Sequence, residues 1–175
     1  GVNKGIEFTM EKDFTRNYYC MMSASIFDSR YRASDGNWYS TYYNNGYIFN
    51  FTGGKEFSVG KSRQNTLGFN IKALLRGGYR YTPVDEALTM SRRRIIYDIS
   101  ETYGKHLPSY QRIDFGVSYR VNKKSSAWTF LIDVQNITDR HNAVRKRFSF
   151  VSGKIVETYS GSVGLVPVAS VKVEF

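Results

Sequence analysis

GLVPVASVKVEF, residues 164–175, is the stretch that decides the fold class. Every odd-numbered residue from Leu165 to Phe175 is apolar, whereas the even-numbered positions toward its end are Ser170, Lys172 and Glu174. Successive side chains of a β-strand point to opposite faces, so this alternation predicts a strand with one apolar and one polar face. Strands of outer-membrane β-barrels alternate in this way between lipid and lumen.

Six more segments predict strands: four follow the same period of two, and two, 18–27 and 46–57, follow it less regularly. In residues 67–75, for example, every odd-numbered residue is apolar and most even-numbered residues are small or polar. The six segments are 6–11, 18–27, 46–57, 67–75, 111–121 and 128–135. Together with the closing stretch they predict seven strands.

The connections between these strands alternate in length. Three are short and polar, at 13–17, 59–65 and 122–126, and three are long, at 29–45, 80–109 and 139–162. Transmembrane barrels have short periplasmic turns and long external loops. The pattern therefore predicts an antiparallel transmembrane β-barrel whose last strand ends in the periplasm. Within the long loops we expect local structure near 90–101 and a hairpin over 148–157 that turns at 152–154.

Strand length favours this hypothesis over a soluble β-sandwich, whose strands also alternate. Sandwich strands usually have about 5 to 6 residues, whereas several segments here keep the period for roughly nine or more. A spanning sheet must close on itself, because lipid offers the backbone no hydrogen-bond partners. Seven strands do not make an even-numbered barrel, so we expect the sequence to be the last part of a larger one. No apolar run approaches the roughly 20 residues of a transmembrane helix.

Aromatic residues make up 16% of the chain, and several adjoin the predicted short turns. These are Tyr18, Tyr19, Phe57, Tyr119, Trp128 and Phe175. We expect them to form an aromatic girdle at the periplasmic interface. The alternative is that they belong to the core of a soluble sandwich.

Polar side chains on the opposite face of the strands are candidates for a barrel lumen. They are Arg76, Arg112, Asp114, Arg120, Asp133 and Lys172. In the first long loop, Trp38, Tyr39, Tyr42 and Tyr43 could stack on sugars or another ring-bearing ligand, or form an aromatic belt at the outer interface. Two basic clusters, Arg92-Arg93-Arg94 and Arg145-Lys146-Arg147, would meet lipopolysaccharide phosphates or an anionic substrate, or remain solvated.

Other functional classes find little support. The net charge of +10 comes without the basic helix or groove, interleaved with aromatic platforms, that a nucleic-acid partner requires. His106 and His141 stand alone, so we expect no catalytic site, metal or cofactor. Gly54 to Ser62 superficially suggests a phosphate-binding loop, but five residues separate Gly54 from Gly60 where that loop has four. We interpret this segment as a strand end and a basic turn.

Four segments together carry a resemblance to a known family. They are GGYRYTPVD at 77–85, LPSYQRIDF at 107–115, DVQNITDR at 133–140 and the closing stretch. The chain resembles the barrel of TonB-dependent outer-membrane transporters of the Bacteroidota type. The resemblance implies a plugged barrel of about 22 strands. Residues 1–175 would then be its C-terminal portion, with the plug domain and the N-terminal strands outside this sequence.

The resemblance also implies a function and partners. The chain would form barrel wall and extracellular loops of a transporter for a nutrient such as a metal chelate or a glycan, in the outer membrane of a Gram-negative bacterium. Its partners would be outer-membrane lipid and lipopolysaccharide, the rest of the barrel with its plug, TonB through the absent N-terminal region, the barrel assembly machinery and a surface lipoprotein. Ala169, Val171, Val173 and Phe175 are similar to the signal that the assembly machinery recognises. The alternative is a small autonomous outer-membrane or surface β-protein that binds a ligand or adheres.

Overall fold

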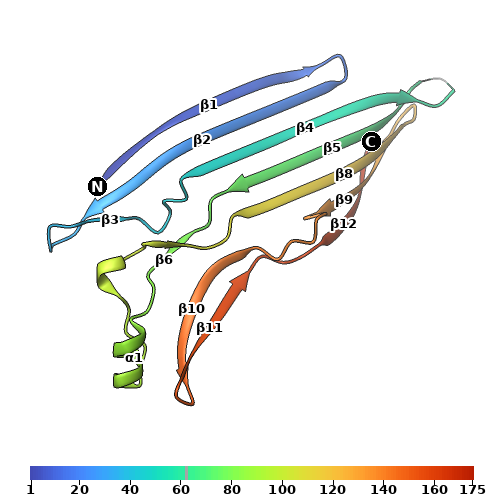
Figure 1. The fold of residues 1–175 in the computed structure, drawn as a ribbon. Helices are drawn as coiled ribbons and strands as arrows, with labels where there is room; N and C mark the ends of the chain where they lie inside the picture. Colours follow the sequence, from blue (N-terminus) through green and yellow to red (C-terminus); the bar gives the residue numbers. More distant parts are fainter. Residues whose placement is uncertain (62) are drawn as a thin grey trace.

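The computed structural model describes residues 1–175 except Ser62. Seven long strands form one antiparallel sheet (Figure 1). They are β1 (Val2–Thr15), β2 (Tyr18–Arg32), β4 (Tyr47–Val59), β5 (Asn65–Arg76), β8 (Tyr110–Asn122), β9 (Ala127–Gln135) and β12 (Val166–Glu174). Each pairs with the next long strand along the chain. The all-β class, the antiparallel pairing and the seven predicted strands are confirmed.

Shorter elements occupy the long connections. They are β3 (Trp38–Ser40), β6 (Arg80–Tyr81), α1 (Glu86–Arg92), a 3₁₀ helix η1 (Ile99–Glu101), β7 (Lys105–His106), β10 (Ala143–Val151) and β11 (Lys154–Gly161). The expected hairpin is β10–β11, which is longer than predicted. It turns at Ser152 and Gly153, whose φ angles of 50° and 78° suit a two-residue hairpin turn. The described residues include no helix that is long and apolar enough to cross a membrane.

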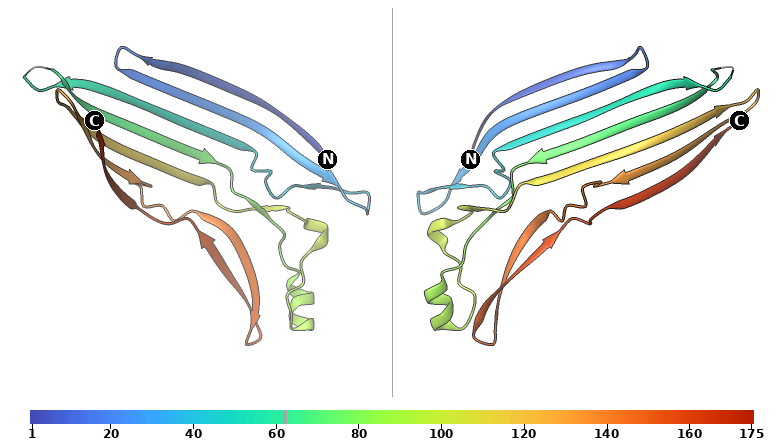
Figure 2. Two further views of the ribbon diagram at one scale, coloured as in Figure 1. Left: turned by 180° about the vertical axis from the view of Figure 1, so that it is seen from behind. Right: turned by 45° about the vertical axis from the view of Figure 1, so that its right-hand side comes forward.

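The two ends of the sheet differ, as the loop lengths predict. The short turns after β1, β4 and β8 lie at one end, together with residue 175 (Figures 1 and 2). The long connections, α1 and the β10–β11 hairpin lie at the other, named here the loop end. Of the segment 54–62, residues 54–59 belong to β4, as interpreted, and Ser62 lies outside the described residues.

Strand register assigns every side chain of the sheet to one of two faces, because directly paired residues share a face. One row of paired residues crosses five strands: Met10, Met22, Phe51, Ala73 and Ile113. Another runs through Phe69, Val117, Ile132 and Ala169. These rows belong to one apolar face, which continues across all seven long strands. The other, polar face carries pairs such as Lys72 with Asp114.

The chain has almost no interior of its own. Leu107, 5% exposed, is the one buried hydrophobic side chain among the described residues. Large side chains of the apolar face are open instead, with Ile6 82% and Ile132 61% exposed. No second layer of described residues lies over this face of the sheet (Figure 2).

The aromatic residues near the short turns do not all lie on the same face of the sheet. Tyr18, Phe57, Tyr119 and Trp128 share the apolar face, as an interfacial girdle requires. Tyr19 does not, and its inclusion was wrong, because it is paired with Gly54 on the polar face. Its ring lies against Gly54, where a Cβ atom would meet it.

Candidate ligand-binding site at the loop end

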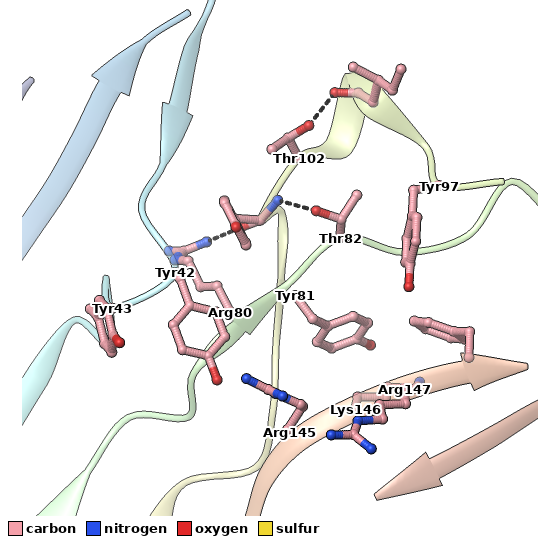
Figure 3. Close-up of a pocket in the computed structure, with 13 residues that line it drawn as sticks. Tyr42, Tyr43, Arg80, Tyr81, Thr82, Tyr97, Thr102, Arg145, Lys146 and Arg147 are labelled. Atoms are coloured by element: carbon pink, nitrogen blue, oxygen red, sulfur yellow. Dashed lines mark hydrogen bonds between the residues drawn. The ribbon is translucent and has the colours of Figure 1, made fainter. Parts of the chain in front are cut away.

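A cavity of about 790 Å³ lies among the long connections, and we name it the loop pocket (Figure 3). Residues from the connections 33–46 and 77–109 and from strand β10 line it. Five are tyrosines, namely Tyr42, Tyr43, Tyr81, Tyr97 and Tyr103. Four are basic, namely Arg80, Arg145, Lys146 and Arg147. Its volume falls in the range of small-molecule sites.

Two glycines let the chain deliver pocket residues past the sheet. A Cβ atom at Gly77 would overlap the carbonyl oxygen of Asn45, and one at Gly78 would overlap that of Leu107. Any other residue type would push these segments apart. The segment therefore passes between its neighbours closely enough to place Arg80 and Tyr81 in the pocket wall.

Stacked tyrosines hold the connection 33–46 against the connection 77–109. Tyr42 stacks on Tyr79 with ring centroids 5.0 Å apart and an angle of 17° between the rings. Tyr43 meets both rings edge-on. The hydroxyl of Tyr42 also donates a hydrogen bond of 3.2 Å to the carbonyl oxygen of Val144 in β10. Tyr42 thus joins all three segments of the pocket.

Arg80 is fixed by backbone carbonyls. Its Nε donates to the carbonyl of Asn44 at 2.9 Å, and its Nη1 donates to that of Tyr103 at 3.1 Å. Asn44 is itself 1% exposed and donates to the carboxylate of Asp28 at 2.8 Å. Burial lowers the pKa of Arg80, while the charge of Asp28 opposes that change. An arginine remains protonated under such a shift, so it contributes a fixed positive charge to the wall.

Lys146 occupies an aromatic corner of the pocket. Its ammonium lies 4.8 Å from the ring centroid of Tyr81 and 5.0 Å from that of Phe148. It forms an ion pair of 2.7 Å with Glu157 on β11. Burial alone would lower the pKa of Lys146, but hydrogen bonds to Glu157 and Tyr159 outweigh it and raise the pKa to about 12. Lys146 therefore stays protonated, and the carboxylate of Glu157 largely compensates its positive charge within the hairpin.

Arg145 and Arg147 differ from Lys146, although they precede and follow it. Both side chains are exposed, and neither forms a hydrogen bond or ion pair with any residue that the structure describes. Figure 3 shows them along the β10 side of the pocket, with Arg80 and the tyrosines across from the strand. The pocket thus combines aromatic faces with positive charges that are open to a ligand.

The predicted loop contacts separate into three places. Tyr42 and Tyr43 line the loop pocket, as just described. Trp38 and Tyr39 are in β3 and line a neighbouring cavity of about 550 Å³ with residues 100–105. Tyr39 donates to Asp35 at 2.7 Å, which lowers the pKa of that carboxyl group. Arg92, the last residue of α1, and Arg93 and Arg94 after it are exposed and line neither cavity, and their contact with a ligand stays a prediction.

The chain matches none of the protein families, curated proteins or solved structures with which it was compared.

Sequence reasoning did not group Arg80, Tyr81, Tyr97 and Tyr103 with the first loop. The density of tyrosine in the connection 77–109 was the available signal. Among the described residues, no group of His, Cys, Asp and Glu side chains is placed to hold a metal ion. The lining of the loop pocket offers a ligand aromatic rings, hydrogen-bonding groups and positive charge.

The six candidate lumen residues all lie on the polar face. Paired residues on this face include Lys72 with Asp114, Gly116 with Asp133, and Arg120 with Thr129, which in turn pairs with Lys172. Arg76 lies on the same face of β5 as Lys72, and Arg112 lies on the same face of β8 as Asp114, because each pair is separated by an even number of residues. Whether this face borders a lumen stays a prediction. Arg112 and Asp114 form a paired contact, with nitrogen–oxygen distances of 2.7 and 2.8 Å.

Asp114 also ties strand β8 to the chain beyond β9. Its carboxylate accepts a hydrogen bond of 2.8 Å from the backbone nitrogen of Asn136. Asn136 is 3% exposed, has a φ of 52° and donates to the carbonyl of Arg140 at 3.0 Å. This part of the polar face is therefore a structural junction below the loop end.

The closing strand pairs with β9 along its whole length. Ala169, Val171 and Val173 face the apolar side opposite Ile132, Phe130 and Trp128. Phe175 lies two residues beyond Val173, where the alternation continues the apolar side, and it is fully exposed. The role of these four residues as an assembly signal stays a prediction.

Proposed function

We propose that the chain forms part of the wall and the extracellular loops of a TonB-dependent outer-membrane transporter that takes up a nutrient. The observation that carries this proposal is the single-layer sheet, whose apolar face crosses all seven long strands and is uncovered by any described residue. Soluble monomers rarely expose a contiguous apolar surface of more than a few hundred Å². In a membrane, hydrocarbon chains would cover that surface.

The strand dimensions support a spanning role. Strand β8 has 13 residues. At about 3.3 Å per residue its length is roughly 43 Å, and a tilt of about 45° reduces its span to about 30 Å. That value is close to the thickness of a bilayer's hydrocarbon core, which is about 30 Å.

The edges of the sheet support a larger assembly. Within the described residues, β1 and β12 each pair with one long neighbour on one side only. Unpaired backbone groups are costly in lipid, so a spanning sheet has to be closed. Further strands of the same barrel would therefore lie at both edges of the sheet, and a plug would lie beside its polar face.

The segments that resemble the transporter family meet in space, which supports the finer part of the proposal. The backbone nitrogen of Leu107 donates to the carbonyl of Tyr79 at 2.9 Å. That of Ile137 donates to the carbonyl of Ile113 at 2.8 Å. Three of the four segments, 77–85, 107–115 and 133–140, are thus joined by backbone hydrogen bonds.

Cysteine labelling in intact Gram-negative cells tests location and orientation. The native Cys20 is first replaced by Ser, and one cysteine is then introduced as Ser149→Cys in the exposed hairpin or Lys124→Cys in the turn after β8. A membrane-impermeant maleimide should label S149C on intact cells, and K124C only after the cells are broken. The protein itself should fractionate with the outer membrane.

Two outcomes would count against parts of this proposal. Recovery of the folded protein in the soluble fraction, or equal labelling of both cysteines on intact cells, would refute the membrane-spanning assignment. Surface labelling of S149C together with ligand binding but no ligand uptake would favour the surface-binding alternative instead.

A further inference from the structure

A groove of about 590 Å³ lies over Gly53 of β4, and we name it the Gly53 groove. Most of its lining side chains belong to the apolar face, where register places Gly53 in one row with Cys20, Ile71 and Phe115. Of the glycines in the seven long strands that the structure describes, only Gly53 lies on this face. The groove therefore lies where a row of the apolar face lacks a side chain.

Aromatic rings form the walls of the Gly53 groove. The ring of Phe51 leans over the glycine, because a Cβ atom there would come within 3.0 Å of it. On the other side, the ring centroid of Phe69 is 6.3 Å from that of Phe115 and 6.0 Å from that of Phe57. Among the described residues that line the groove, Lys55 alone is charged. The interior of the groove thus suits a hydrocarbon chain.

Two lysines stand at the end of the groove that is nearer the short turns. Lys55 is paired with Tyr18, and its ammonium lies 5.2 Å from the ring centroid of Phe57, two residues closer to the turn after β4. The ammonium of Lys12 lies 3.9 Å from the ring centroid of Tyr18 and donates to the carbonyl oxygen of Thr15 at 3.2 Å. Both ammonium groups therefore reach from the apolar face toward its short-turn end, as lysines do at a membrane interface.

The positive charge at this end of the sheet is not compensated. Neither Lys12 nor Lys55 forms an ion pair with an acidic side chain that the structure describes. The sequence of the three short turns, 13–17, 59–65 and 122–126, contains one acidic residue, Asp13. It contains five basic residues, namely Arg16, Lys61, Arg63, Lys123 and Lys124. An anionic group beside the groove would therefore be attracted by its surroundings as well as by the two lysines.

The groove and the lysines together indicate a ligand with two unlike ends. A small soluble anion would use the ammonium groups and leave the apolar walls uncovered. A zwitterionic lipid would fill the groove but would bring a cation of its own beside the lysines. Only a hydrocarbon chain that ends in a group of net negative charge complements both parts.

We propose that the Gly53 groove binds a phospholipid of net negative charge. One acyl chain lies over Gly53 between the rings of Phe51 and Phe69, and the phosphate group contacts Lys12 and Lys55. The inference rests on the proposed function only in that the apolar face then lies in a bilayer, with the short-turn end at the periplasmic leaflet.

Native mass spectrometry of the native-length protein in detergent tests the lipid class. The probes are phosphatidylglycerol, phosphatidylcholine with the same acyl chains, and glycerophosphoglycerol, which is the anionic headgroup without chains. One phosphatidylglycerol should bind about tenfold or more tightly than phosphatidylcholine, and glycerophosphoglycerol should show no measurable binding.

A matched pair of lysine variants tests the charged end. K12Q/K55Q should lower the affinity for phosphatidylglycerol about tenfold, to the level of phosphatidylcholine. K123Q/K124Q removes the same charge from the turn after β8, outside the groove, and should leave the affinity unchanged. Lys55→Gln alone, which removes no hydrogen bond to a described residue, should lower the affinity without disturbing the turn after β1.

A matched pair of leucine variants tests the apolar part. Gly53→Leu fills the groove and should weaken binding of both phospholipids by about tenfold. Ala24→Leu adds a leucine to the apolar face of β2 outside the groove, where Ala24 is paired with Phe8 and Phe49, and should leave both affinities unchanged.

Four results would overturn the inference: equal affinity for the two phospholipids, equally tight binding of glycerophosphoglycerol, equal losses in the two double lysine variants, or equal effects of the two leucine variants. The proposed function fails separately. A protein that fractionates with the outer membrane yet does not prefer phosphatidylglycerol keeps its proposed function and loses this site. A protein that is soluble in plain buffer yet prefers phosphatidylglycerol through Lys12 and Lys55 keeps the site and loses the membrane-spanning assignment.

Discussion

Adjacent residues in strand β9 provide a sharp test of the two faces of the sheet. Ile132 lies on the apolar face between Val117 and Ala169 and is 61% exposed. Leu131 lies on the polar face between Ser118 and Ser170. The two residues are near the middle of the nine-residue strand, so they share almost the same membrane depth. Ile132→Arg and Leu131→Arg therefore place the same charge at the same depth on opposite faces.

The expected difference is large. An arginine on the lipid face near the bilayer midplane costs about 2–4 kcal/mol in unfolding free energy. That corresponds to a loss of about 30-fold to several hundred-fold in the folding equilibrium constant. At position 131 the new guanidinium would meet serine hydroxyls and share its face with Asp133, so we expect a cost of less than about 1 kcal/mol.

Denaturant titration of the native-length protein folded into lipid vesicles measures both values, with tryptophan fluorescence as the signal. The wild-type protein and Leu131→Arg should unfold at similar denaturant concentrations, and Ile132→Arg at a clearly lower one. Equal destabilisation by both substitutions would refute the assignment of two different faces. An Ile132→Arg variant that folds without lipid or detergent would refute the lipid contact itself.

Three further predictions concern single contacts. Asp114→Ala should lower the unfolding free energy by about 1–3 kcal/mol, because two donors lose their acceptor. Glu174→Ala, at an exposed ion pair that solvent screens, should leave the unfolding free energy almost unchanged in the same titration. The Lys146–Glu157 pair raises the pKa of the lysine from 10.5 to about 12. The stability that the pair contributes is therefore present below about pH 10.5 and lost as the pH rises through 12. In Glu157→Gln, an NMR titration should show the pKa of Lys146 lowered toward its ordinary value. Gly78→Ala should cost about 1–3 kcal/mol through overlap with a backbone carbonyl, and faster proteolysis of the connection 77–109 would report it.

The seven strands and the alternation of loop lengths were readable from the sequence because both are local. Side-chain period depends only on strand geometry, and turns such as Ser152-Gly153 carry residues that tolerate a positive φ. The same local reasoning placed Tyr19 on the wrong face, since Tyr18 and Tyr19 are both aromatic and only the pairing with β4 tells them apart.

The candidate site was much less accessible to sequence reasoning. It is built from residues of the connections 33–46 and 77–109 and of β10, which are far apart in the chain. The two basic clusters look alike in the sequence, yet Arg145-Lys146-Arg147 lines the loop pocket and Arg92-Arg93-Arg94 lies in solvent at the C-terminal end of α1. Loop contacts such as the hydrogen bond from Tyr42 to Val144 depend on the paths of long connections, which no residue period dictates.

The sequence by itself determined the strands, their apolar and polar sides and the positions of the turns, because these follow from a repeat of two residues and from local backbone preferences. Only the tertiary structure decided that the apolar sides of seven strands join into one uncovered face, and that Lys146 of β10 meets Tyr81 of a distant connection. The physical reason is that register and loop packing depend on contacts between segments, whereas the period of a strand depends on the segment alone.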